Sequence, residues 1–240
     1  MGRSPQSSQG GNTVLRNWTI SGLDALLFDL DGVLVNSVAA IEECMRRWAT
    51  ERGLDGDRVV ALAHGRRDAD LVRLVAPRLD VDTEVARIAE LDFEVMDTLT
   101  AVTGAADLLG TLPPSSWAIV TSGTPPIARA RLAAVGLPEP SLVITAADVA
   151  HGKPDPEGYL LAAEKLGVPP ERCAVFEDAP VGLGAATAAG MRCVGVGVGM
   201  AVSSPALDAW VDDLGSVRAE AGRSGITLAG SWATVPVGMT

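Results

Sequence analysis

The chain has 240 residues, enough for one substantial core or for a core domain with a smaller insert. Its formal net charge of −11 argues against nucleic acid or an anionic membrane as a partner, and Cys44, Cys173 and Cys193 form no pattern typical of disulfides or zinc. No apolar run reaches the roughly 18 residues of a membrane span, so we expect a cytoplasmic protein, a monomer or small homo-oligomer, whose partner is a small molecule.

The predicted elements begin after a polar leader. Residues 1–20 are rich in Gly, Ser, Gln and Asn, and we expect them to be disordered and outside the fold. Short apolar runs typical of buried strands follow at 25–30, 117–122, 141–145, 173–178 and 192–198. Helical segments between the later runs end at Gly136, Gly167 and Gly190. Strands that alternate with helices predict an α/β fold with a doubly wound parallel sheet.

Residues 37–102 interrupt this alternation. They contain no strand-like run, and stretches such as "VAAIEECMRRWATERG" and "TEVARIAELDFEVMDTL" have the period of amphipathic helices. We expect a helical insert here, with the α/β core made by residues 21–36 and 103–240. From about residue 224 the sequence has no clear period, and it leaves open whether the tail is an edge strand or is frayed.

Polar side chains gather at the carboxyl ends of the predicted strands. They are Asp29 and Asp31 after the first strand, Thr121, Ser122 and Gly123 after the second, Lys153 beyond the third, and Glu177 and Asp178 after the fourth. Because the carboxyl ends of parallel strands share one edge of the sheet, these groups should meet there. Several carboxylates with one lysine favour a hard divalent cation such as Mg²⁺, which often also contacts phosphate.

Each of these pieces, taken alone, also has a structural interpretation. Asp29 and Asp31 are residues common in turns, and Lys153 alone is typical of a solvated position. The stretch "TSGTPP" could simply begin a helix, although the N–H groups at such a helix start also bind phosphate. The occurrence of all four pieces at four strand ends favours a catalytic site.

The stretches "FDLDGVLVNS", "TSGT", "GKPDPEGYL" and "FEDAPVGLGAATAAGM" resemble the four motifs of the haloacid dehalogenase superfamily of phosphatases and mutases, over about residues 23–214. The helical insert is similar to the small mobile cap of the sugar-phosphate and polyol-phosphate phosphatases of this superfamily. Within it, "AHGRRDADLVRLVAP" resembles a segment of yeast glycerol-3-phosphatases and 2-deoxyglucose-6-phosphatases. The sequence departs from the family pattern at Asn36, where Asp is usual, and at Thr103, where Pro is common.

The resemblance implies Mg²⁺-dependent hydrolysis of small sugar or polyol phosphates through an aspartyl-phosphate. Asp29 would be the nucleophile and Asp31 the general acid and base. The phosphate would be bound by Thr121, Ser122, Gly123 and Lys153, of which Thr121 and Lys153 are also counted as catalytic. The metal would be held by Asp29, the main-chain carbonyl of Asp31, Asp178 and Glu177. The cap would contact the rest of the substrate through His64, Arg66 and Arg67, unless Arg67 pairs with a neighbouring acid such as Asp70.

Three other functions remain compatible with this fold to different degrees. A sugar phosphomutase would use the same pair of aspartates, and no residue excludes it. A dehalogenase normally lacks the second aspartate and the metal acids, so Asp31 and Asp178 argue against it. A non-catalytic protein that binds a phosphorylated ligand should have lost at least one core group, whereas all of them are present.

Overall fold

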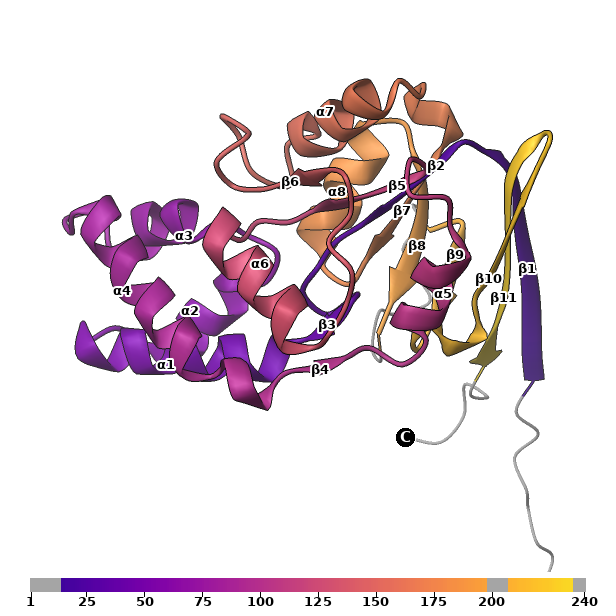
Figure 1. The fold of residues 1–240 in the computed structure, drawn as a ribbon. Coiled ribbons are helices and arrows are strands. Elements are labelled where there is room, and N and C mark those ends of the chain that lie inside the picture. The colour runs from indigo at the N-terminus through magenta and orange to yellow at the C-terminus, as the bar shows by residue number, and fades with distance from the viewer. Residues whose placement is uncertain (1–13, 198–206, 235–240) are drawn as a thin grey trace, which may run out of the picture.

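The computed structural model describes residues 14–197 and 207–234. Its centre is a six-stranded sheet of order β6-β5-β2-β7-β8-β9, in which every neighbouring pair is parallel (Figure 1). The strands are β2 (Ala25–Phe28), β5 (Trp117–Val120), β6 (Val143–Ile144), β7 (Cys173–Glu177), β8 (Arg192–Val196) and β9 (Ala209–Val211). The predicted α/β fold is therefore confirmed. Residue 198, the last of the fifth predicted strand, lies outside the described residues.

Helices cover both faces of this sheet, which explains why its strands read as continuous apolar runs. Along β2, Leu26 and Phe28 belong to one buried cluster, whereas Ala25 and Leu27 belong to another on the opposite face. The helices are α5 (Ala105–Thr111) and α6 (Pro125–Ala134) on the first face, and α7 (Glu157–Leu166) and α8 (Pro180–Ala188) on the second. In residues 14–197 and 207–234, no helix is both long and apolar enough to cross a bilayer.

Four helices form a separate group between β3 (Val35–Asn36) and β4 (Thr100–Ala101) (Figure 1). We call residues 37–102 the helical segment; besides the helices it contains the short strand β4, which the sequence did not predict. The helices are α1 (Val38–Glu51), α2 (Gly56–Ala63), α3 (Asp68–Val75) and α4 (Val81–Glu94), followed by a short 3-10 turn, Met96–Thr98. Their apolar faces enclose a core of their own around Trp48 and Ile88. Asn36 donates to Thr100 Oγ1 and to the Ala101 carbonyl, each at 3.1 Å. Asn36, a residue that differs from the family pattern, thus links β3 to β4, the two strands that connect the helices to the core.

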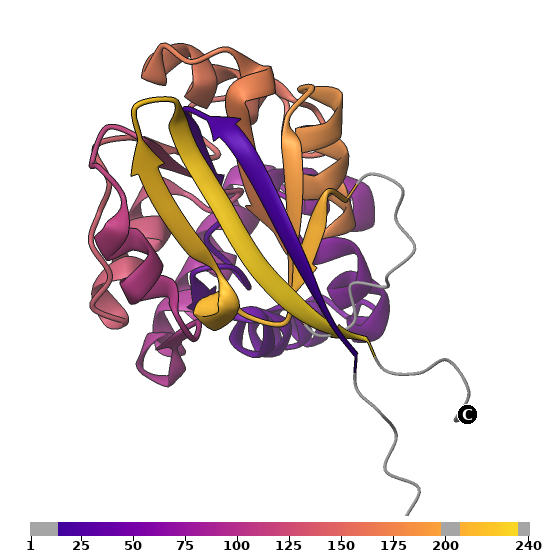
Figure 2. The same ribbon diagram turned by 90° about the vertical axis from the view of Figure 1, so that its right-hand side faces the viewer.

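A three-stranded antiparallel sheet of order β1-β11-β10 packs at the other end of the molecule (Figure 2). It consists of β1 (Val14–Leu23), β10 (Arg218–Gly222) and β11 (Gly225–Thr234). The prediction of a disordered leader is wrong for residues 14–20, which lie in β1, while residues 1–13 lie outside the described residues. The sequence left open whether the tail from about residue 224 is an edge strand or is frayed. Residues 225–234 form β11, the central strand of this sheet. This pairing joins the two ends of the chain, so no local pattern indicates it.

Trp18 anchors β1 on the core. Its side chain is 8% exposed and belongs to the buried cluster beneath the sheet. Gly230 lies opposite it on β11, and a Cβ atom at that position would come within 2.5 Å of the indole ring. Because Gly230 has no side chain, the Trp18 ring fits in the space above it.

Replacement of Trp18 by Ala should lower the free energy of unfolding by about 3 kcal/mol, because a large buried side chain is lost and a cavity remains. Urea unfolding followed by circular dichroism measures the change. Asn17→Ala is the matched control, since the exposed neighbour faces solvent and its loss should change stability little. Equal stability of the Trp18 variant and the control would contradict the packing of β1 on the core.

Candidate active site

Asp29 follows β2 directly and is held by Lys153. Its backbone N–H donates to the Phe176 carbonyl at 3.0 Å, which fixes the end of β2 beside β7. Lys153 Nζ donates to Asp29 Oδ1 at 2.6 Å, to Glu177 Oε1 at 2.6 Å and to the Val120 carbonyl at 3.1 Å. All three charged side chains are buried. The strand ends therefore bring together the predicted nucleophile and the predicted lysine.

The charges in this cluster shift one another's pKa values. Burial raises the pKa of Asp29 well above its usual range; Lys153 opposes this shift, and the neighbouring acids Glu177, Asp178 and Asp31 add to it. Burial acts against the charge of Lys153, but Asp29 and Glu177 outweigh it and hold the lysine pKa above its ordinary value. A further positive charge near Asp29 would therefore stabilise the ionised carboxylate.

Glu177 uses both of its oxygens within the protein. Oε1 accepts hydrogen bonds from Lys153 and, at 2.7 Å, from the Tyr159 hydroxyl, and Oε2 accepts from the backbone N–H groups of Asp178 and Ala179. Any Cβ atom at Gly182 would lie 1.8 Å from Oε1, so only glycine fits on that side. The geometry thus suits Glu177 to hold Lys153 better than to bind a metal. Tyr159 stabilises this arrangement and was not among the predicted site residues.

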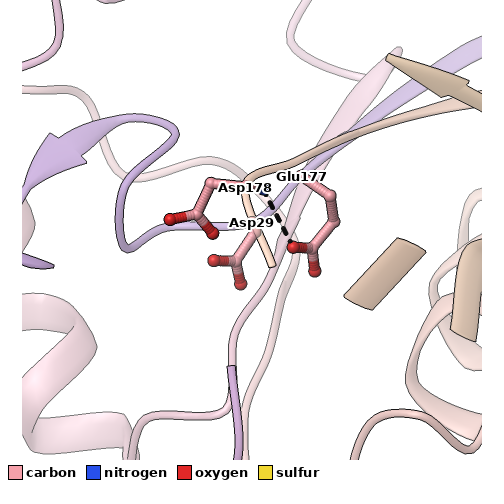
Figure 3. Close-up of side chains that lie close together, drawn as sticks. All are labelled: Asp29, Glu177 and Asp178. Carbon is pink, nitrogen blue, oxygen red and sulfur yellow. Dashed lines mark hydrogen bonds between the residues drawn. The ribbon is translucent and has the colours of Figure 1, made fainter. Parts of the chain in front are cut away.

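Asp178 has a different environment. One of its carboxylate oxygens lies within 4.8 Å of an oxygen of Asp29 and of an oxygen of Glu177, and Figure 3 shows the three side chains gathered where β2 and β7 end. Asp178 Oδ2 lies 2.9 Å from His64 Nε2, while the buried Oδ1 has no hydrogen-bond partner among the described residues. Burial raises the pKa of Asp178, and His64 opposes that rise. A buried carboxylate oxygen without a donor beside a second carboxylate fits a hard cation.

Asp31 is held on both carboxylate oxygens. Ser37 Oγ donates to Oδ1 at 2.6 Å, and Arg131 Nη1 donates to Oδ2 at 2.6 Å. Arg131 also donates through Nη2 to both oxygens of Asp92, at 2.9 and 2.8 Å. Arg131 was not among the predicted site residues, although its spacing from Ile127 and Ala128 places it on the buried side of α6 and indicates a buried charge.

The predicted phosphate-binding loop lies at the end of β5 but uses part of its polar groups internally. Thr121 Oγ1 accepts the Gly123 N–H at 3.0 Å, and Ser122 Oγ donates to the Gly65 carbonyl of the helical segment at 2.8 Å. Gly65 has φ +74°, and a Cβ atom there would lie 2.6 Å from Val181. A glycine at this turn therefore lets the helical segment approach the core closely.

A cavity of about 220 Å³ separates the helical segment from the strand ends. Its core side includes Asp29, Asp31, Ser122, Gly123, Arg131 and Asp178, and its helical side includes His64, Arg66, Asp68 and Asp92. The structure thus brings two of the three predicted cap residues, His64 and Arg66, to the cavity. Asp68 was not identified from the sequence because an acid in the first turn of a helix is ordinary. Burial, followed by the charge of Asp92, raises the pKa of Asp68 to about 7.

Arg67, the third predicted cap residue, does not line this cavity. Its guanidinium donates to both carboxylate oxygens of Asp70, at 2.7 and 3.1 Å, and to the carbonyls of Val149 and Ala150, both at 3.0 Å. The structure therefore shows the alternative arrangement, in which Arg67 pairs with Asp70. The two carbonyls precede Lys153 in the chain, so Arg67 connects the helical segment to the loop that carries the lysine.

Comparisons with known proteins agree with this geometry. The model of the haloacid dehalogenase-like hydrolases matches residues 23–190. Hexitol phosphatase A of Escherichia coli (strain K12) is 41% identical over 175 residues, which are 71% of this chain and 81% of its own. The 2-deoxyglucose-6-phosphate phosphatase 1 of Saccharomyces cerevisiae is 35% identical over 196 residues, 72% of this chain and 79% of its own. The crystal structure of a hydrolase from Pseudomonas syringae, 25% identical, superposes with a TM-score of 0.72 over 80% of this chain and 94% of its own.

Proposed function

The chain belongs to the haloacid dehalogenase-like hydrolases and is a phosphatase of that family, and we propose that it hydrolyses phosphate monoesters of small sugars or polyols. The observation that carries this proposal is a buried Asp29, held by Lys153 and facing a cavity that the helical segment covers. The relatives at 41% and 35% identity are named for phosphatase activity, which favours hydrolysis over the return of the phosphoryl group to a sugar.

In the first step Asp29 acts as the nucleophile. Its Oδ1 is held by Lys153, which leaves Oδ2 to attack phosphorus as the bond to the leaving alcohol breaks. The lysine reduces the repulsion between this carboxylate and the anionic ester. Asp31 donates a proton to the oxygen of the departing alcohol. The products of this step are the free alcohol and an aspartyl-phosphate at Asp29.

In the second step water replaces Asp29 on phosphorus. Asp31, now without its proton, accepts one from the water that attacks, and the bond between phosphorus and Asp29 breaks. Inorganic phosphate leaves and both aspartates return to their starting states. Thr121, Ser122 and Gly123 lie at the end of β5. The Thr121 hydroxyl and the Ser122 N–H would donate to the phosphate oxygens, because the Ser122 hydroxyl and the Gly123 N–H already donate within the protein.

The residues at the strand ends fit Mg²⁺. Asp29 and Asp178 offer carboxylate oxygens close together, and the buried Asp178 Oδ1 has no donor in residues 14–197 and 207–234. We propose these two side chains and the Asp31 main-chain carbonyl as protein ligands. Glu177 is not included, because it already accepts hydrogen bonds from Lys153 and Tyr159. When bound, the ion would neutralise the negative charge shared by the acids and the phosphate.

The helical segment serves in this proposal as a cap that closes over the leaving group. It supplies His64, Arg66, Asp68 and Asp92 to the cavity, so hydroxyl groups of a polyol or sugar meet both donors and acceptors there. Closure over the strand ends would also exclude bulk water and so strengthen the electrostatic interactions around the reacting phosphate. The division into a core of residues 21–36 and 103–240 and a cap of residues 37–102 belongs to this proposal.

A panel of phosphate esters tests the proposed substrate class. Phosphate release in the presence of Mg²⁺ should have a kcat/KM for hexitol, deoxyhexose and glycerol phosphates at least about 10-fold above that for nucleotides or phosphopeptides, because hydrogen-bonding pockets discriminate by such factors or more. An Asp29→Asn preparation made in parallel controls for contaminating phosphatases. Faster release from nucleotides or phosphopeptides would refute the sugar or polyol specificity.

A further inference from the structure

Asp68 lies at the cavity wall, where its carboxylate is available to a ligand. It is the first residue of α3, and in the part of the chain that the structure describes it forms no hydrogen bond or ion pair. The other two acids that the helical segment places at the cavity are engaged: Glu42 accepts from Arg46 at 3.2 Å, and Asp92 accepts twice from Arg131. The two oxygens of Asp68 can therefore accept hydrogen bonds from a molecule in the cavity.

Asp68 does not cap its own helix. Asp55 and Asp80, which precede α2 and α4, accept hydrogen bonds from backbone N–H groups of their helices, at 3.1 and 3.2 Å for Asp55 and at 3.0 Å for Asp80. Asp68 lies one residue past the start of α3 and accepts no such bond within residues 14–197 and 207–234. An acid that caps no helix but lines a cavity indicates a role toward the contents of that cavity.

The surroundings of Asp68 are negatively charged. After burial, the influences on its pKa are the charges of Asp92, Arg131 and Asp31. Arg131 already contacts both of these acids, at 2.6 to 2.9 Å, so it adds no uncompensated positive charge beside Asp68. A hydroxyl group can donate to such a carboxylate, whereas a second anion is repelled by it and must also lose its hydration.

We propose that Asp68 is a specificity-determining residue, which accepts hydrogen bonds from hydroxyl groups of the leaving alcohol and rejects a leaving group that carries a carboxylate or a second phosphate there. This inference rests on the proposed function and narrows it to esters of uncharged polyols and sugars. The attractive part is the hydrogen bond between hydroxyl and carboxylate, and the repulsive part is the contact between like charges.

Three esters with one carbon skeleton test this inference. Propyl phosphate has no hydroxyl group, glycerol 3-phosphate has hydroxyl groups, and 3-phosphoglycerate has a carboxylate in place of the terminal alcohol. Hexyl phosphate, sorbitol 6-phosphate and 6-phosphogluconate form the same series on a longer chain, and the series that the wild type hydrolyses faster is used. Burial raises the pKa of Asp68 to about 7, so assays at pH 8 keep most of its carboxylate ionised. The wild type should then have a kcat/KM for the polyol ester at least about 10-fold above that for the acid ester.

Two substitutions separate charge from hydrogen bonding. Asp68→Asn keeps an acceptor and removes the charge, so it should raise kcat/KM for the acid ester about 10-fold and change that for the polyol ester less. Asp68→Ala also removes the acceptor. It should lower kcat/KM for the polyol ester about 10-fold, the lower end for a hydrogen bond to a charged group, and leave the alkyl ester nearly unchanged.

Asp82→Asn is the matched control. Asp82 is an exposed acid in the first turn of α4 and does not line the cavity, so the same chemical change there should leave the ratios between the esters as they are in the wild type. A shift of these ratios in Asp82→Asn as large as that in Asp68→Asn would contradict the inference.

The ratios between esters decide the outcome. Equal changes on all three esters in the Asp68 variants would make Asp68 a structural residue, and an unchanged ratio in Asp68→Asn would place the discrimination elsewhere. A wild type that prefers the acid ester would mean that a cation such as Arg66 attracts a second anion. Each of these results would overturn the inference.

A binding measurement separates this inference from the proposed function. Calorimetric titration of Asp29→Asn protein with the same esters and Mg²⁺ reports affinity without turnover. The polyol ester should bind at least about 10-fold more tightly than the acid ester, and Asp68→Asn in the same background should reduce that difference. A wild type that hydrolyses none of the esters would refute the proposed function, whereas equal affinities for both esters would refute the role of Asp68.

Discussion

Replacement of Asp29 by Asn should lower kcat by more than about 10³-fold, since variants without their nucleophile lose activity on this scale or more. The amide preserves the shape of the side chain but is not a nucleophile toward phosphorus. Lys153 keeps its bonds to Glu177 and the Val120 carbonyl, so the buried site should remain assembled. Steady-state phosphate release measures the rate, and circular dichroism measures the fold.

Asp24→Asn is the matched control for this variant. Asp24 lies at the opposite end of β2 and pairs with Arg172, away from the cavity. Its replacement should leave kcat unchanged even if stability falls slightly. Activity of the Asp29 variant above a few per cent of the wild-type rate would refute the covalent mechanism.

Removal of divalent metal should abolish activity as completely as the loss of the nucleophile. We expect EDTA to stop phosphate release, excess Mg²⁺ to restore it and Ca²⁺ to inhibit, because calcium prefers longer bonds and more ligands. The physical reason is the density of negative charge: burial and neighbouring acids already raise the pKa of Asp29, and an anionic ester adds to that charge. Undiminished turnover in chelator would contradict this account.

Calorimetric titration of the protein with Mg²⁺ separates metal binding from activity. Asp178→Asn should weaken binding markedly, since it removes a carboxylate whose buried oxygen has no donor among the described residues. Asp148→Asn is the control, because that carboxylate accepts hydrogen bonds from Thr145 at 2.9 and 2.7 Å and does not line the cavity. Equal affinity in all three proteins would rule out Asp178 as a ligand.

The sequence predicted the parts of the fold that depend on local chemistry. The apolar run at 25–30 became β2 because both faces of that strand are buried, and the acids that follow it had to lie at the strand end. The rule that parallel strands share one carboxyl edge then placed Asp29, Lys153 and Asp178 together. These inferences needed only the burial of the strands, the spacing of apolar residues along the sequence and the common direction of parallel strands.

Contacts between distant residues could not be predicted in this way. Strand β1 mixes polar with apolar residues and pairs with β11, some two hundred residues later in the chain. The position of Arg131 on the buried side of α6 indicates a buried charge, but only the packing of α6 against α4 shows that its partner is Asp92. Arg67 offers the same donors to a substrate as to Asp70, and only the position of the neighbouring loop decides between them.

The phosphorylation state of Asp29 tests the central claim most directly. Asp31→Asn protein can be mixed with p-nitrophenyl phosphate and Mg²⁺, quenched in acid, digested and analysed by mass spectrometry; this ester needs no acid for the first step, and the missing base should slow the second. The account predicts a phosphoryl group on Asp29 in the peptide from the end of β2, and none when Asp29 is also replaced by Asn. A phosphoryl group on another residue, or none while turnover proceeds, would contradict it.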